Sequence, residues 1–208
     1  EDSLIDCSEV QVCWVPMKRR GNRHYVRYLV GRFRPAVQAA KSDPKAWGKC
    51  SLLTLTSDAK RDREKNLMTI ERDWNRLRTA ISRRLGRRFE YVKCCELTKK
   101  GHAHLHVLLI GVPFISQRWL SQKWLEFHSA SIVDIRHARN PPHAIKYLVK
   151  YILKTCEARK STIDAISYFW YHRKRQWTVS RRFWELVFSC LSSSLDTRQG
   201  MTNATAGI

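Results

Sequence analysis

Apolar residues in the middle of the chain recur with the spacing of an amphipathic helix. Steps of three or four residues separate the apolar side chains of Leu67, Ile70, Trp74, Leu77, Ile81 and Leu85. Such spacing places them on one face of a helix, and Gly86, which follows directly, is typical of a helix C-cap. The pattern therefore predicts a long helix that buries one face and ends near residue 86.

Shorter runs of apolar and β-forming residues predict strands on both sides of this helix. Strands are predicted over 52–56, 89–97, 103–110 and 131–136, and also at Val10–Val15 and Tyr25–Phe33. Helices are predicted over 116–127 and from Asn140-Pro141-Pro142 to about Lys154, while 163–190 is helical or mixed. We expect an N-terminal extension over 1–48, a main domain over 49–190 and a polar, flexible tail over 191–208.

The strands over 89–97 and 103–110 are predicted to form a hairpin. Between them lies Lys99-Lys100-Gly101, and three-residue hairpin loops commonly end on a glycine in the left-handed conformation. Centring the turn on Lys100 pairs residues at equal distances from it. Glu96 is therefore expected directly opposite His104 on the neighbouring strand.

Two histidines separated by one residue suggest a metal site on this hairpin. Alternate side chains of a strand share a face, so His104 and His106 lie together, away from Leu105. With Glu96 opposite, two imidazoles and a carboxylate form a three-ligand, open site. Nitrogen and oxygen ligands without thiolate suit Mn²⁺ or Mg²⁺, although Zn²⁺ could also bind. The alternative is a pair of surface histidines on a half-buried strand.

Residues 147–154 place two phenols and two ammonium groups on one side of a helix. At about 100° per residue, Tyr147, Lys150, Tyr151 and Lys154 fall within an arc of about 100°. A cation beside a phenol lowers the phenol's pKa and screens an approaching phosphate. These four residues are therefore candidate catalytic groups. The alternative is an ordinary amphipathic helix with tyrosines at its boundary and lysines in water.

The net charge of the chain indicates a polyanionic partner. Lys and Arg number 39 and Asp and Glu 18, which gives a formal net charge of +21. Nucleic acid is the leading candidate, and the aromatic residues among the basic ones near the C-terminus suit single-stranded DNA. The alternative is a solvated basic surface that serves solubility. The predicted DNA contacts are Lys99, Lys100, His102, Arg173, Lys174, Arg175, Trp177 and Arg181.

Cysteine usage and hydropathy favour an intracellular protein. The seven cysteines include no CxxC pair, and Cys94 and Cys95 stand in an apolar stretch where buried thiols are expected. No apolar run approaches the roughly 18–20 residues that cross a bilayer, so we expect no membrane partner.

Three segments, in this order, resemble the motifs of HUH endonucleases. They are Leu53-Thr54-Leu55-Thr56, then Glu96 with His104-Leu105-His106, then Tyr147-x-x-Lys150-Tyr151. Over about residues 50–155 the chain is similar to rolling-circle replication initiators of small single-stranded DNA viruses, phages and plasmids. Relaxases place their tyrosine before the histidines and fit less well.

The resemblance implies an α+β fold of the ferredoxin-like or HUH nuclease type, with a central antiparallel sheet and flanking helices. It also implies that Glu96, His104 and His106 bind the metal, and that Tyr147 or Tyr151 attacks a phosphate of single-stranded origin DNA. The products would be a 5′-phosphotyrosyl link and a free 3′-OH, and joining would reverse the step. We expect Tyr147 to react first. Such a protein would act in a bacterial cytoplasm, or in the nucleus of a eukaryotic host.

Other functions stay open at this point. The run His102-Ala-His104-Leu-His106 also resembles the signature of histidine triad nucleotide hydrolases and transferases, which need no metal. That alternative leaves the tyrosine helix and the charge of +21 unexplained. A non-enzymatic, basic DNA-binding module is a third possibility, and a transposase that uses the same chemistry is a fourth.

Overall fold

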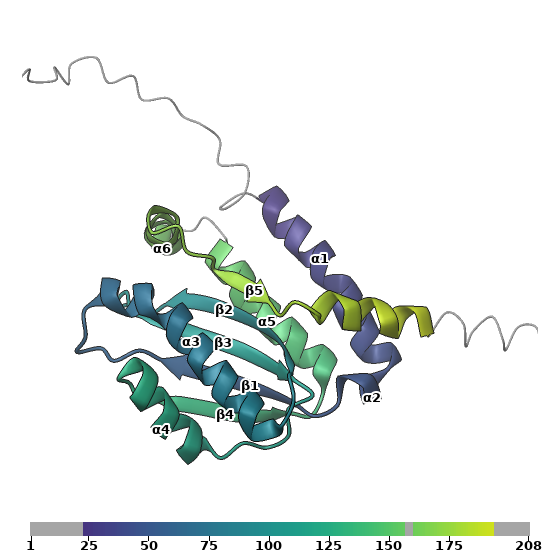
Figure 1. Ribbon diagram of the computed structural model, residues 1–208. Helices are drawn as coiled ribbons and strands as arrows, with labels where there is room; N and C mark the ends of the chain where they lie inside the picture. Colours follow the sequence, from purple (N-terminus) through teal and green to yellow (C-terminus); the bar gives the residue numbers. More distant parts are fainter. Residues whose placement is uncertain (1–22, 157–159, 194–208) are drawn as a thin grey trace, which may run out of the picture.

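A single antiparallel sheet forms the centre of the fold. The computed structural model describes residues 23–156 and 160–193. Its strands are β1 (Cys50–Thr56), β2 (Glu90–Leu97), β3 (Ala103–Ile110), β4 (Val133–Ala138) and β5 (Trp177–Val179), in the order β4-β1-β3-β2-β5 (Figure 1). All neighbouring strands are antiparallel. The predicted α+β fold, a central antiparallel sheet with flanking helices, is confirmed.

Helices cover both faces of this sheet (Figure 1). On one face lie α3 (Arg63–Leu85) and α4 (Gln117–His128), and on the other lies α5 (Pro141–Cys156), against which α1 (Arg23–Ser42) packs. The short α2 (Pro44–Trp47) links α1 to β1, and α6 (Lys160–Tyr171) precedes β5. A further helix spans residues 183–193.

The two-residue period of the strands divides their side chains between two apolar cores. Leu105 and Val107 of β3 belong to the core beneath α3 and α4, in which Trp74 is fully buried. Leu108 of β3 belongs to the core beneath α5 and α1, in which Phe33 is buried. The sheet is therefore packed on both faces, and a polar side chain on it must find a partner or line an opening.

The predicted helix ends are confirmed at two positions. Gly86 adopts a left-handed conformation, with φ of 67°, and its N–H donates to the carbonyl of Arg83. The side chain of Asn140 accepts a hydrogen bond from the amide of His143 at 3.1 Å, which caps α5. The cysteine prediction is also confirmed, because Cys94 and Cys95 carry buried thiols rather than disulfides.

The strand predicted at Tyr25–Phe33 is wrong, because these residues belong to α1. β-forming residues are common there, but Leu29, Phe33, Ala36 and Ala40 recur at helical spacing and are all buried against the second core. Burial of this stripe outweighs the weak local preference for a strand. The predicted strand at Val10–Val15 and most of the predicted tail, residues 194–208, lie outside the described residues.

Candidate functional site

The predicted pairing of the two central strands is confirmed. Glu96 of β2 stands directly opposite His104 of β3, as centring the turn on Lys100 required. Gly101 has a φ of 82° in that turn, a left-handed conformation that favours glycine. On the other side of β3, Thr56 of β1 pairs with His104, and Thr54 pairs with His106. The histidines therefore occupy the middle strand of the sheet, with Glu96 on one flank and two threonines on the other.

Glu96, His104 and His106 meet on the face of the sheet that carries α5. The two imidazole ring centres are 4.7 Å apart, and Nε2 of His106 lies 3.2 Å from Oε2 of Glu96. The other carboxylate oxygen of Glu96 accepts a hydrogen bond from the Lys154 ammonium group. His106 is buried and His104 and Glu96 are half-buried, so the cluster lies below the surface beside α5.

The threonines of β1 orient the two histidines, a role that the sequence analysis did not assign to them. The Thr56 hydroxyl lies 3.1 Å from Nε2 of His104, and the Thr54 hydroxyl lies 3.4 Å from Nδ1 of His106. Each imidazole is thus held by a side-chain hydroxyl from the next strand. The available signal was the alternation of Leu53-Thr54-Leu55-Thr56, which places both hydroxyls on one face of a strand.

The charge states of the cluster suit metal binding. Burial opposes ionisation of Glu96, but hydrogen bonds from His106 and Lys154 outweigh it and lower its pKa to about 2. Burial, together with the neighbouring His106, lowers the pKa of His104 to about 4. At neutral pH the site therefore offers an ionised carboxylate and a neutral imidazole, the forms in which these groups bind metal ions.

The side chains are nevertheless not arranged around a metal ion as they stand. Within residues 23–156 and 160–193, no group of three or more His, Cys, Asp or Glu side chains has a metal-holding arrangement. The reason lies in the partners of Glu96, whose two oxygens are taken by Lys154 and His106. A metal ion would need Glu96 to release Lys154 and turn away from direct contact with His106.

The two tyrosines of α5 lie against this cluster. The ring of Tyr151 stacks on His106 with centres 3.9 Å apart, and its hydroxyl lies 2.8 Å from that of Tyr147. Tyr147 is 47% exposed, so a substrate could reach its hydroxyl from solvent. The predicted grouping on α5 is confirmed, since Ile145, Leu148 and Ile152 are buried on the opposite side of the helix.

The prediction that neighbouring lysines lower the phenol pKa is wrong for Tyr151. Its hydrogen bond with Tyr147 and its burial raise the pKa of Tyr151 to about 12. Lys154 does not offset this effect, because its ammonium group is bonded to Glu96. Arg136 of β4 has a smaller lowering effect on the same pKa. This exposed arginine, which is paired with Asp134, is a further cation near the tyrosines that the sequence analysis missed.

His102 does not share the face of the other two histidines, as the strand alternation had predicted. It precedes β3 within the turn, and its Nδ1 accepts a hydrogen bond of 3.3 Å from the buried Asn66 of α3. The side chain of His102 is therefore buried on the α3 side of the sheet. The alternation fails because the residue lies outside the regular strand.

The predicted DNA contacts near the C-terminus divide into buried and exposed groups. Trp177 packs edge-on against Phe33 of α1, with ring centres 5.4 Å apart, so this ring serves the core rather than stacking on DNA bases. Arg173, Arg175 and Arg181 are exposed, as are Lys99 and Lys100 in the hairpin turn, and Lys174 is half-buried. A hollow of about 500 Å³ is lined by Phe169, Trp170, Tyr171, Arg173, Lys174 and Arg175.

A second constellation of polar residues is fully buried and has no signal in the sequence. Nδ1 of His128 lies 2.9 Å from Oδ2 of Asp73, and its Nε2 lies 2.8 Å from the Ser57 hydroxyl. This is the connectivity of a hydrolase triad. Because Ser57 is only 3% exposed and the other two side chains are not exposed at all, no substrate reaches it. We therefore interpret it as a structural network that joins the end of β1 to α3 and α4.

Together, these features define a basic α+β protein with a candidate phosphoryl-transfer site, in which paired histidines and a carboxylate on the sheet meet two tyrosines on a helix. Residues 50–156 match the replication-associated protein family of the ORF2 type, and the chain belongs to this family. None of the helices in the described part of the chain is long and apolar enough to span a membrane.

A viral protein is a further relative. "Uncharacterized protein 1" of Halorubrum pleomorphic virus 1 is 34% identical over 131 residues, which cover 51% of this chain and 26% of that protein. The chain thus spans about a quarter of the length of this relative. No solved structure gives a significant match.

Proposed function

We propose that this protein nicks and rejoins single-stranded DNA at a replication origin by tyrosine transesterification, assisted by a divalent metal ion, as an HUH-type endonuclease. The observation that carries the proposal is the contact between the two halves of the site. Tyr151 stacks on His106, and the Tyr147 hydroxyl is bonded to that of Tyr151. Membership of a replication-associated family and the charge of +21 support a DNA substrate.

Glu96, His104 and His106 would hold the metal ion, which we propose to be Mn²⁺ or Mg²⁺. Their chemistry fits such an ion, because the carboxylate is ionised and His104 is neutral at pH 7. When bound, the ion would polarise the scissile phosphate and stabilise the charge that develops on it. The threonine hydroxyls of β1 would keep the two imidazoles in position.

The tyrosines would supply the nucleophile. The Tyr147 oxygen forms a bond to phosphorus while the bond from phosphorus to the 3′ oxygen breaks; the phenol loses its proton and the 3′ oxygen gains one. The protein keeps the 5′ phosphate and releases a 3′-OH that could prime synthesis. Tyr151 lies within one hydrogen bond of Tyr147 and could attack in a second reaction. Lys150, which is exposed on the same arc of α5, would attract the phosphate.

Exposed cations elsewhere on the surface would bind the rest of the strand. Next to the hollow described above, Trp170 is 68% and Tyr171 80% exposed, and they flank Arg173 and Arg175. Exposed rings beside cations bind single-stranded nucleic acid, because each base can stack on a ring while its phosphate meets a cation. We propose that Lys99, Lys100 and Arg181 make further phosphate contacts.

Trapping the covalent intermediate tests this proposal. The protein is incubated with Mn²⁺ and a pool of single-stranded hairpin oligonucleotides of random sequence, and denatured adducts are digested and identified by mass spectrometry. We expect a nucleotide on Tyr147, and no adduct in EDTA. Tyr147→Phe should abolish the adduct or move it to Tyr151, whereas Tyr28→Phe, which changes a half-exposed tyrosine of α1, should have no effect.

Histidine variants test the metal half of the site. His106→Ala should lose cleavage while keeping most of its DNA affinity, because affinity depends mainly on phosphate contacts. His137→Ala, which changes an exposed histidine of β4, is the matched control. Normal cleavage by His106→Ala would refute the metal site. DNA binding without any adduct, at every metal tried, would instead indicate a binding module.

The placement of His102 argues against the histidine triad alternative. This residue is bonded to Asn66 on α3, so the three histidines do not form one cluster. Metal-independent release of AMP from a nucleotide amidate substrate would favour that alternative nonetheless.

A further inference from the structure

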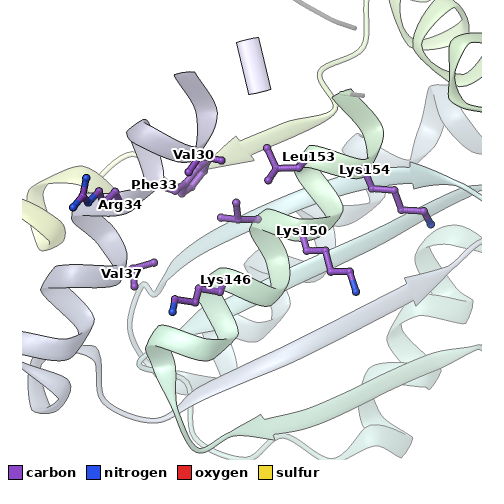
Figure 2. A pocket seen from close by; sticks show the side chains of 9 residues that line it. Val30, Phe33, Arg34, Val37, Lys146, Lys150, Leu153 and Lys154 are labelled. Atoms are coloured by element: carbon purple, nitrogen blue, oxygen red, sulfur yellow. The ribbon is translucent and has the colours of Figure 1, made fainter. Parts of the chain in front are cut away.

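A groove runs between α1 and α5, beside the candidate site. It encloses about 590 Å³, a volume in the range of ligand pockets in proteins. Val30, Phe33 and Val37 of α1 face Val149 and Leu153 of α5 across it, as Figure 2 shows for all but Val149. Its basic lining consists of Arg34, Lys146, Lys150 and Lys154. No Asp or Glu is among the described residues that line it.

The basic residues of α5 separate this groove from the tyrosines. Lys146, Lys150 and Lys154 follow one another at steps of four residues and so form one row along the helix. In Figure 2 the side chains of Lys150 and Lys154 extend away from α1, and that of Lys154 reaches Glu96 of the candidate site. By the rotation of about 100° per residue, Tyr147 and Tyr151 lie beyond this row, on the side away from the groove.

We infer that the groove between α1 and α5 binds the single-stranded DNA segment next to the scissile phosphate, with unstacked bases on its apolar floor and phosphates along the lysine row. The inference rests on the proposed function, since the strand must leave the tyrosines across this row. An apolar floor with cations on one edge complements the base and phosphate sides of a nucleotide. Paired bases turn inward and could not reach the floor, so duplex DNA should not compete.

Charge reversal tests the groove apart from the chemistry. Binding of a fluorescent oligothymidine of about 20 nucleotides is measured in EDTA by anisotropy, across salt concentrations. Arg34→Glu and Lys146→Glu should each weaken binding about tenfold and lower the salt dependence by about 0.7 per lost phosphate contact. Arg83→Glu makes the same change of charge on the exposed surface of α3, across the sheet, and should have a much smaller effect.

Photo-cross-linking identifies what occupies the groove. p-Benzoylphenylalanine replaces Val30 at the groove in one preparation and Leu125, which is 53% exposed on α4, in the control. We expect cross-links to the oligothymidine from position 30 and few from position 125. A cross-link from position 30 to residues 1–22 of the same chain at saturating DNA would overturn the inference, as would equal competition by duplex DNA.

The outcomes also separate this inference from the proposed function. Arg34→Glu and Lys146→Glu variants that bind like Arg83→Glu, in a protein that forms the tyrosine adduct, refute the groove alone. Groove-dependent binding in a protein that forms no adduct refutes the proposed function and leaves the groove as a single-strand binding site.

Discussion

Replacing His128 by phenylalanine should destabilise the protein severely, because His128 is the middle member of the buried network with Ser57 and Asp73. Phenylalanine has a similar size and can keep the stack on Trp124, whose ring centre lies 4.4 Å from that of His128. The two hydrogen bonds, of 2.8 Å to Ser57 and 2.9 Å to Asp73, are lost. The substitution therefore tests polar satisfaction rather than packing.

The expected cost follows from what stays buried. A buried polar group left without a partner costs about 1–3 kcal/mol, and a charged group costs more. Ser57 loses its side-chain partner, and Asp73 keeps only the hydrogen bond from Arg72 at 2.9 Å. We expect a loss of about 3–5 kcal/mol in the free energy of unfolding, a large part of the roughly 5–15 kcal/mol typical of a domain. Urea denaturation followed by tryptophan fluorescence measures it, with the exposed His137→Phe as the control.

The same residue should contribute to the pH dependence of stability. Burial lowers the pKa of His128, Asp73 opposes this, and Arg61 and Arg72 add to it. Because the folded pKa lies below the unfolded value of about 6.5, the unfolded chain takes up the proton more readily. Stability should fall as the pH drops below about 6.5, by at most about 1.4 kcal/mol per pH unit for this group, and His128→Phe should reduce that slope. A loss under about 1 kcal/mol, or an unchanged slope, would refute the reasoning.

Three further variants or treatments probe the site and the core. Thr54→Val removes the hydroxyl beside Nδ1 of His106 and should reduce metal affinity or nicking about 10–100-fold at unchanged DNA affinity, measured by Mn²⁺ titration; equal activity would contradict this positioning role. Burial raises the pKa of Cys95 to about 12, so iodoacetamide at pH 8 should label it only after unfolding, as mass spectrometry would show; fast native labelling would contradict the structure. Trp74→Ala, at a fully buried ring, should cost about 3–5 kcal/mol in urea denaturation, and a loss under about 1 kcal/mol would contradict its place in the core.

Most of the sheet could be predicted from the sequence because local signals agreed with the fold. The glycine of the hairpin turn fixed the pairing of β2 and β3, and the helical spacing that ends at Gly86 fixed α3. The first helix could not be predicted in this way. Its strand-like residues, Tyr25 to Phe33, are helical because one stripe packs against α5, more than a hundred residues away.

The candidate site could be predicted where it depends on one hairpin and one helix. Glu96 opposite His104 follows from the turn, and the grouping of Tyr147 with Tyr151 follows from helical geometry. Contacts between distant segments could not be predicted. The bond from Lys154 to Glu96 joins residues 58 positions apart, and the bond from Ser57 to His128 spans 71 positions.

The position of the histidines on the middle strand gives the two halves of the site unequal local stability. β3 is hydrogen-bonded to strands on both sides, so its amides should exchange with solvent only when the sheet itself opens. Tyr147 and Tyr151 are carried by a helix that is held to the sheet by side-chain packing alone. Small rigid shifts of that helix can therefore bring the phenols toward or away from an anchored set of ligands without disturbing them.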